Sequence, residues 1–290
     1  MTKRRFLQFL TATPLLALSL TGCSALGAFN AVIPKDRGVT VVARNVSYGA
    51  EPRQKLDVYA PPESDGDAGV VVFAYGGSWN SGSKSDYAFA ARAFAARGFV
   101  TIVFDYRLVP EIRYPVFVED GAKAVAWAYR NAATYGGNPD RLYLVGHSAG
   151  AYNAMMVALA PQFLQAEGLS PAIIRAAAGL SGPYDFLPLD VDSTRAAFSG
   201  VSDLPATQPV NNVRAGRSTP AVFVATGDAD DLVRPRNTKR LAAALREAGH
   251  GVEEKYYPGV DHAGTLLAIA KPLRGRAPVV EDIVRFFRAN

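Results

Sequence analysis

The feature that most constrains the fold of this chain is an alternation of short apolar runs with longer segments of helical period. Nearly continuous apolar runs of this length are typical of strands covered on both faces of a sheet. They occupy residues 70–73, 99–104, 142–145, 176–180 and 221–225, with a last strand expected at 252–257. Helical periodicity falls between and after them, at residues 86–96, 117–134, 148–160, 237–248 and 279–288. The alternation predicts an α/β fold, with a mostly parallel sheet and helices on both faces.

Two further strands are expected before this alternation begins. Residues 39–46 and 55–59 alternate β-branched with polar side chains, which predicts half-buried, antiparallel strands and brings the sheet to eight. With 290 residues, 49% of them hydrophobic and 20% charged, the chain has the composition of a globular protein with one sizeable core. We therefore expect one domain over residues 39–290. Residues 183–216 are long and rich in turn residues, which indicates a cap or an insertion that lines the substrate site.

The N-terminal segment is typical of an export signal. Residues 1–22 begin with the basic run Lys3-Arg4-Arg5, continue with an apolar stretch and end in small residues before Cys23. The sequence Leu20-Thr21-Gly22-Cys23 resembles the bacterial lipobox, in which the cysteine is lipidated and becomes the first residue of the mature protein. The alternative is an ordinary thiol beside a plain secretory cleavage site. The basic run fits either a twin-arginine signal or an ordinary secretory one.

These features predict an exported bacterial lipoprotein, anchored to a membrane through Cys23 on the periplasmic side or at the cell surface. Residues 23–38 would then tether the lipid to the domain. Removal of residues 1–22 takes away three basic residues and no acid, so the formal charge falls from +5 to +2. The basic isoelectric point is therefore no indication of nucleic-acid binding.

The pentapeptide Gly146-His147-Ser148-Ala149-Gly150 lies between an expected buried strand and an expected helix. In this context the pattern Gly-x-Ser-x-Gly is typical of a nucleophile elbow, a sharp turn that exposes a serine hydroxyl at the carboxyl edge of a sheet. The flanking glycines allow the strand and the helix to approach closely, and the helix N-terminus favours negative charge. Ser148 is therefore predicted to be a catalytic nucleophile, the alternative being a serine that only caps a helix.

A serine nucleophile needs a neighbouring base, and the chain has 3 histidines. His147 adjoins the serine, and its side chain is expected to point away from the hydroxyl. His250 lies in a glycine-containing segment typical of a helix C-terminus. His262 follows the last expected strand, at the edge where open α/β sheets bind ligands, and it comes after Ser148 in the chain, which matches the order serine, acid, histidine of folds with such an elbow. We therefore predict His262 to be the general base.

The base in turn needs an acid that holds its tautomer and stabilises the imidazolium ion. Residues 227–233 follow the next-to-last expected strand and contain Asp228, Asp230 and Asp231. By position all three remain candidates, although Asp228 also fits a turn-forming role.

Together these residues resemble the esterase and lipase branch of the α/β-hydrolase superfamily, near hormone-sensitive-lipase-like enzymes, feruloyl-esterase-like proteins and kynurenine formamidases. Tyr75-Gly76-Gly77-Ser78-Trp79 is similar to the family's His-Gly-Gly-x-Trp oxyanion loop, and Ser81-Gly82-Ser83-Lys84 follows it. The resemblance runs from about Lys55 to the C-terminus and implies the α/β-hydrolase fold. It also implies that the main-chain amides of Gly77, Ser78 and Ala149 form an oxyanion hole. The family signature Gly-x-x-Asp-x-x-Val selects Asp230, with Asp231 as the next candidate.

One position departs from the resemblance, because Tyr75 stands where relatives usually carry histidine. Its hydroxyl either braces the loop or changes the shape of the pocket, and the sequence leaves both open. Trp79 and Tyr184 are candidates for the substrate pocket, although each is equally typical of a core aromatic, and the same two interpretations apply to Phe186. A structural role that ties loops to the sheet is favoured for the remaining family-like segments, Asp105-Tyr106-Arg107, Tyr114-Pro115 and Glu119-Asp120.

The expected function is hydrolysis of carboxylic esters through an acyl-serine intermediate, with a small-molecule ester as substrate and neither a metal nor an organic cofactor. The first alternative is an amide hydrolase such as an arylformamidase, since the Gly-Gly-x-Trp and Ser-Gly-Ser-Lys segments are shared with that group. The export signal argues against the cytoplasmic role of such enzymes. The second alternative is a non-catalytic binding protein of the same fold, because a fold alone does not establish a function.

Overall fold

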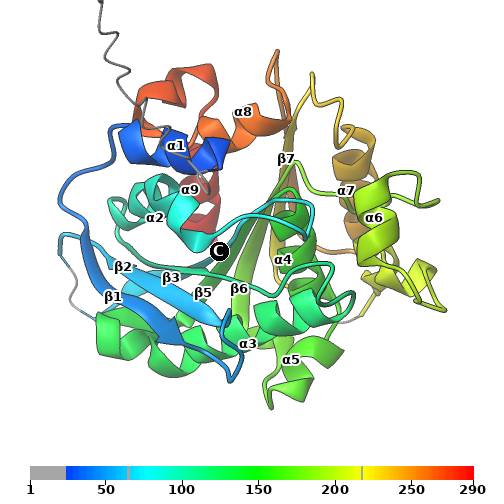
Figure 1. Cartoon of the computed structure of the whole chain (residues 1–290), viewed down its shortest axis with the longest axis horizontal. Coiled ribbons are helices and arrows are strands. Elements are labelled where there is room, and N and C mark those ends of the chain that lie inside the picture. The colour runs from blue at the N-terminus through cyan, green and yellow to red at the C-terminus, as the bar shows by residue number, and fades with distance from the viewer. Residues whose placement is uncertain (1–23, 64–65, 217) are drawn as a thin grey trace, which may run out of the picture.

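A computed structural model describes residues 24–63, 66–216 and 218–290 of the chain. Its centre is an eight-stranded sheet with the order β1-β2-β4-β3-β5-β6-β7-β8. The strands are β1 Thr40–Ser47, β2 Lys55–Ala60, β3 Ala68–Ala74, β4 Phe99–Phe104, β5 Gly137–His147, β6 Ile174–Leu180, β7 Ala221–Gly227 and β8 Val252–Tyr257. β2 pairs antiparallel with β1 and β4, and all other pairs are parallel. The predicted eight-stranded, mostly parallel sheet is confirmed (Figure 1).

Burial of the strands explains the sequence pattern from which they were predicted. Every residue of β4 is buried, and β3, β6 and β7 are buried over nearly their whole length. Strands covered on both faces need apolar side chains at successive positions, which produces continuous runs. β1 lies at the edge of the sheet and has no fully buried residue, so its sequence alternates instead.

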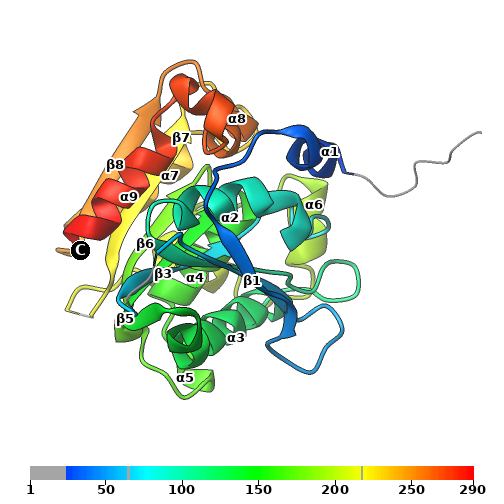
Figure 2. The same ribbon diagram turned by 90° about the vertical axis from the view of Figure 1, so that its left-hand side faces the viewer.

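Helices cover both faces of the sheet (Figures 1 and 2). The long ones are α2 Ala88–Ala95, α3 Val116–Asn131, α4 Ala149–Leu159, α7 Arg236–Glu247 and α9 Val279–Ala289. α2 and α9 contact one another on one face, and α3 and α4 pack together on the other. Short 3-10 helices complete the connections: η1 Lys84–Tyr87, η2 Ala132–Tyr135, η3 Pro171–Ile173, η4 Pro205–Thr207, η5 Pro209–Asn212 and η6 Lys271–Arg276.

Four helices were not predicted from the sequence, namely α1 Ala25–Val32, α5 Gln162–Ala166, α6 Asp192–Ala197 and α8 His262–Leu267. α5, α6 and α8 have 5 or 6 residues, which is too short for a helical period to emerge, whereas α1 has 8 and depends on the distant contacts described next. Residues 183–216, expected to form a cap or an insertion, contain α6, η4 and η5.

The segment expected to tether the domain differs from that expectation, because it folds back as α1. Ser24 caps the helix by accepting a hydrogen bond from the Gly27 amide, and its hydroxyl donates to Asp86 at 2.9 Å. The ring of Phe29 packs edge-on against Phe89. These partners lie some sixty positions away in the sequence, where no local pattern reveals them.

The expected signal peptide and the expected lipidation site, Cys23, lie outside the described residues. Within the part of the chain that the structure describes, no helix has the length and hydropathy needed to cross a bilayer.

Candidate active site

The turn between β5 and α4 carries Ser148 in a backbone conformation that few non-glycine residues adopt, with φ 55° and ψ −125°. Its neighbours must be small. A Cβ on Gly146 would lie 2.3 Å from the carbonyl oxygen of Gly150, and a Cβ on Gly150 would lie 2.1 Å from that of Ala74. The two glycines therefore allow the strand, the helix and β3 to meet beneath the serine, as the elbow pattern predicts.

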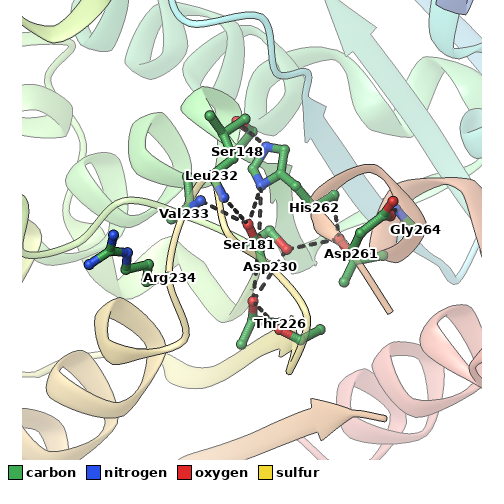
Figure 3. Close-up of polar contacts among 12 residues, drawn as sticks. Ser148, Ser181, Thr226, Asp230, Leu232, Val233, Arg234, Asp261, His262 and Gly264 are labelled. Atoms are coloured by element: carbon green, nitrogen blue, oxygen red, sulfur yellow. Dashed lines mark hydrogen bonds and ion pairs between the residues drawn. The ribbon is translucent and has the colours of Figure 1, made fainter. Parts of the chain in front are cut away.

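His262 is the first residue of α8, directly after the loop that follows β8. The side chain of Asp261 caps this helix by accepting a hydrogen bond from the Gly264 amide at 2.7 Å. The cap fixes the start of the helix and with it the imidazole. Nε2 of His262 lies 2.9 Å from Oγ of Ser148, within reach of its proton (Figure 3).

Asp230 follows β7 and is almost fully buried, with 1% of its surface exposed. Its carboxylate lies 2.9 Å from Nδ1 of His262 and accepts hydrogen bonds from the amides of Leu232 and Val233 (Figure 3). Burial raises the pKa of Asp230. This effect is outweighed by the hydrogen bond to His262, the Coulombic interaction with His262 and the hydrogen bond from the Val233 amide, so that the pKa is lowered overall. The carboxylate is thus held ionised against the imidazole.

The two neighbouring acids do not contact His262. Asp228 is exposed and accepts a hydrogen bond from the Gly259 amide, which ties the loop after β7 to the loop after β8. Asp231 is exposed and lines the pocket described below. The structure therefore brings together Ser148, His262 and Asp230.

The other two histidines have structural contacts. His147 is buried, and its Nε2 lies 3.0 Å from the main-chain oxygen of His262 rather than at the serine hydroxyl. Burial and, less strongly, the Coulombic interaction with His262 lower the pKa of His147 to about 3, which keeps this ring neutral. His250 follows α7, and its Nε2 lies 2.9 Å from the main-chain oxygen of Arg214.

The expected oxyanion loop follows β3 and is built on left-handed backbone at three successive residues, Gly77, Ser78 and Trp79. A Cβ on Gly77 would lie 2.3 Å from the carbonyl oxygen of Ser81, so the tight turn requires glycine. Ser78 and Ala149 line the same pocket as Ser148, on the loop and at the start of α4. Their amides and that of Gly77 thus come from the two segments that a serine hydrolase uses for its oxyanion hole.

Tyr75 braces this loop and does not line the pocket. It is fully buried between the rings of Tyr87 and Tyr106, and its hydroxyl donates to Asp105 at 3.0 Å. Arg53 donates to the same hydroxyl at 3.0 Å and to the main-chain oxygen of Tyr106. Of the two roles that the sequence left open for this tyrosine, the contacts are those of a brace.

The family-like segments also bind the scaffold, as their structural interpretation expects. Arg107 forms a bidentate pair with the buried carboxylate of Asp120, at 2.7 and 3.0 Å. A second buried pair, Lys84 with Asp57 at 2.8 Å, was not predicted. It anchors the end of the segment after the oxyanion loop to β2, and the sequence holds no signal for it because Asp57 stands in an otherwise ordinary strand.

Beside Ser148 lies a pocket of about 260 Å³, bounded by the oxyanion loop, α6 and the loop after β7. Trp79 lines it, and its indole nitrogen donates to Asn153 at 3.1 Å. Tyr184, predicted as a pocket residue, is instead fully buried against Gly179 and Gly182, so this assignment is corrected. Phe186, two positions later, lines the pocket in its place.

A serine hydrolase of the α/β-hydrolase fold is the class that this sheet and this hydrogen-bonded set of side chains define. Comparison with known families narrows the class: the sequence model of the BD-FAE family matches residues 56–245, and the chain belongs to that family.

Curated relatives agree with this placement. The chain is 34% identical over 265 residues to a probable isoprenylcysteine alpha-carbonyl methylesterase of Oryza sativa subsp. japonica, covering 84% of the chain and 62% of the relative. It is 28% identical over 260 residues to the esterase LipQ of Mycobacterium tuberculosis, covering 83% and 61%. A kynurenine formamidase of Salmo salar is 33% identical over 153 residues, 53% of this chain and 50% of that one. The chain spans about three-fifths of the length of the plant relatives.

Solved structures agree on the fold. Esterase B from Lactobacillus rhamnosis superposes with a TM-score of 0.80 at 19% identity, over 91% of this chain and 90% of that one. A truncated carbohydrate esterase from gut microbiota gives a TM-score of 0.76 at 19% identity, over 89% and 98%. The resemblance to the esterase branch is confirmed, and the plant and mycobacterial relatives are themselves named as esterases.

Proposed function

We propose that this chain hydrolyses carboxylic esters through an acyl intermediate on Ser148, with His262 as base and Asp230 as its acid partner. The observation that carries the proposal is the unbroken hydrogen-bonded series from Asp230 through His262 to the Ser148 hydroxyl, at the wall of a pocket. Esterase names among the relatives support the same activity.

In the first half of the reaction, Nε2 of His262 takes the hydroxyl proton while Oγ of Ser148 bonds to the carbonyl carbon of the ester. Negative charge then develops on the carbonyl oxygen, and the proposed donors to it are the main-chain amides of Gly77, Ser78 and Ala149. The intermediate collapses by breaking the bond to the alcohol oxygen, which leaves with the proton from His262.

In the second half a water molecule replaces the alcohol. His262 takes a proton from the water as its oxygen attacks the acyl carbon, and the proton returns to Oγ of Ser148 when the acid departs. Asp230 stabilises the imidazolium ion that forms in each half, since its lowered pKa keeps it ionised.

A second candidate is amide hydrolysis, favoured by the similarity to a kynurenine formamidase. The same side chains can catalyse this reaction, because an amide differs from an ester only in that an amine, and not an alcohol, leaves with the proton of His262. A non-catalytic binding role is disfavoured, since binding alone does not need a serine hydroxyl 2.9 Å from a histidine that is itself paired with a buried carboxylate.

A substrate panel tests the proposal. The purified chain and its Ser148→Ala variant are assayed with p-nitrophenyl acetate, a feruloyl ester and N-formylkynurenine. We expect turnover of esters with a higher kcat/KM than the formamide, and loss of all turnover in the variant. A preference for N-formylkynurenine would support the second candidate, and a folded wild-type chain that cleaves none of the three would contradict both.

We also propose that the chain is an exported bacterial lipoprotein, held at the periplasmic side of a membrane or at the cell surface through Cys23. The basic start, the apolar stretch and the lipobox-like Leu20-Thr21-Gly22-Cys23 support this location. Because α1 packs on the domain from Ser24 onward, a lipid at the preceding residue would hold the domain close to the bilayer.

A further inference from the structure

Exposed apolar side chains form part of the lining of the pocket beside Ser148. Among the described residues, five large hydrophobic side chains are exposed, and two of them, Val191 and Leu232, line this one pocket. Val191 directly precedes α6, and Leu232 lies in the loop after β7 (Figure 3). Val191 is 49% and Leu232 69% exposed. Apolar side chains that gather at a binding site indicate a ligand that covers them.

Two aromatic rings also line the pocket, beside the polar side chains of Ser193, Thr194 and Asn237. Trp79 is buried and Phe186 half-buried, and their ring centroids lie 6.3 Å apart beside Ser148 and Ala149. A ligand group that starts at the Ser148 hydroxyl can therefore contact the rings of Trp79 and Phe186 and the exposed side chains of Val191 and Leu232.

The charged residues of the rim do not select a charged ligand. Two carboxylates, Asp190 and Asp231, and two guanidinium groups, Arg234 and Arg236, line the pocket, and all four residues are exposed. Their formal charges cancel, and water screens them at the surface. The set therefore gives the rim no net formal charge of either sign.

The size of the pocket sets how far a ligand extends. Its volume of about 260 Å³ is slightly below the range of ligand pockets, roughly 300–1,000 Å³. A short acyl or alcohol group fits inside, whereas a longer one has to continue over the mouth.

We propose that the substrate is a neutral ester with an extended apolar group, which leaves the pocket across Val191 and Leu232 and buries their side chains. The inference deepens the proposed ester hydrolysis and rests on it. The two side chains then determine specificity by chain length, since each methylene that loses water contact contributes about fourfold to kcat/KM.

The test uses the wild-type chain with Val191→Ala, Leu232→Ala and the double variant. One arm compares p-nitrophenyl acetate, butyrate, octanoate and decanoate, and the other compares ethyl, butyl and octyl acetates, all below their micelle-forming concentrations. Val42→Ala on β1 is the matched control, because Val42 is 42% exposed and does not line the pocket. Thermal melting of each variant verifies its fold.

We expect the wild type to prefer a long ester in at least one arm, which identifies the acyl or the alcohol side. In the double variant the ratio of kcat/KM for the longest ester of that arm to that for its shortest ester should fall about fourfold or more, with no change in the control. An unchanged ratio in both arms would overturn the inference, as would a preference for esters that carry a carboxylate or an ammonium group. A wild type without activity on any ester would instead contradict the proposed function itself.

Discussion

Nε2 of His147 lies 3.0 Å from the main-chain oxygen of His262, so the residue before the nucleophile supports the loop that carries the base. Its ring centroid lies 5.0 Å from that of His262. The ring also meets the oxyanion loop, because a Cβ on Gly76 would lie 3.1 Å from its Nδ1. The buried imidazole of His147 thus contacts both the segment that carries His262 and the oxyanion loop, and His147 itself lies in the turn that carries Ser148.

This contact predicts that His147→Ala lowers kcat more than His147→Gln, because the glutamine amide can still donate to the oxygen of His262. KM should change little, since His147 does not line the pocket. Steady-state kinetics on an ester measures both. Equal losses in the two variants would mean that the hydrogen bond does not position the base.

The same residue predicts an acid sensitivity of stability. The folded-state pKa of His147 is lowered to about 3 from 6.5. Between these two pH values the unfolded chain therefore binds a proton on His147 that the folded chain does not bind. This contribution is fully present above about pH 6.5 and declines as the pH falls toward about 3. In urea titrations across that window, His147→Gln should lose less unfolding free energy than the wild type. Parallel curves would contradict a buried neutral His147.

Asp230→Asn should reduce kcat by on the order of ten-thousand-fold, the loss typical of a triad aspartate that no longer fixes the histidine tautomer. Asp231→Asn is the matched control, since its carboxylate is adjacent in sequence but exposed and without a contact to His262. Its loss should be far smaller. If Asp231→Asn proved the more damaging of the two, the assignment of the acid would be wrong.

Tyr75→Phe should destabilise the domain by about 1–3 kcal/mol, because it removes the buried hydroxyl that donates to Asp105 and accepts from Arg53 and leaves both side chains with their main-chain partners. Denaturant unfolding measures the change. The oxyanion loop should also loosen, which lowers kcat while KM stays near its wild-type value. A variant with unchanged stability and kcat would show that the hydroxyl is not a brace.

Lipidation at Cys23 predicts that the native protein enters the detergent phase of a cloud-point separation, because two or more acyl chains anchor stably. Cys23→Ser should remain in the aqueous phase with ester hydrolysis unchanged. A wild-type protein that stays wholly aqueous after export, with its mature N-terminus at another residue, would replace the lipoprotein by a plain secreted hydrolase.

Much of the fold and two of the site residues were predictable from the sequence for physical reasons. Strands buried on both faces need apolar side chains at successive positions, which is visible in the sequence as continuous apolar runs. The elbow geometry requires glycine two positions before and two positions after Ser148, at Gly146 and Gly150. His262 followed from its place after the last strand. Among the three acids, the resemblance favoured Asp230, but the physical distinction, burial with two amide donors, exists only in three dimensions.

The errors came from segments without periodicity. Tyr184 and Phe186 stand in one irregular stretch, which is tied to Asn237, whose side chain accepts hydrogen bonds from the amides of Tyr184 and Asp185. That contact joins residues more than fifty positions apart. The helix α1 was missed for the same reason, since its partners Asp86 and Phe89 are distant in sequence.

The most direct test of the central claim, that Ser148 is a nucleophile activated by His262, is covalent labelling with a fluorophosphonate followed by peptide mass spectrometry. We expect one adduct, on Ser148, in the wild type, no adduct in Ser148→Ala, and labelling slowed by several orders of magnitude in His262→Ala. An unlabelled but folded wild-type protein, an adduct on another residue, or labelling of His262→Ala at the wild-type rate would contradict it.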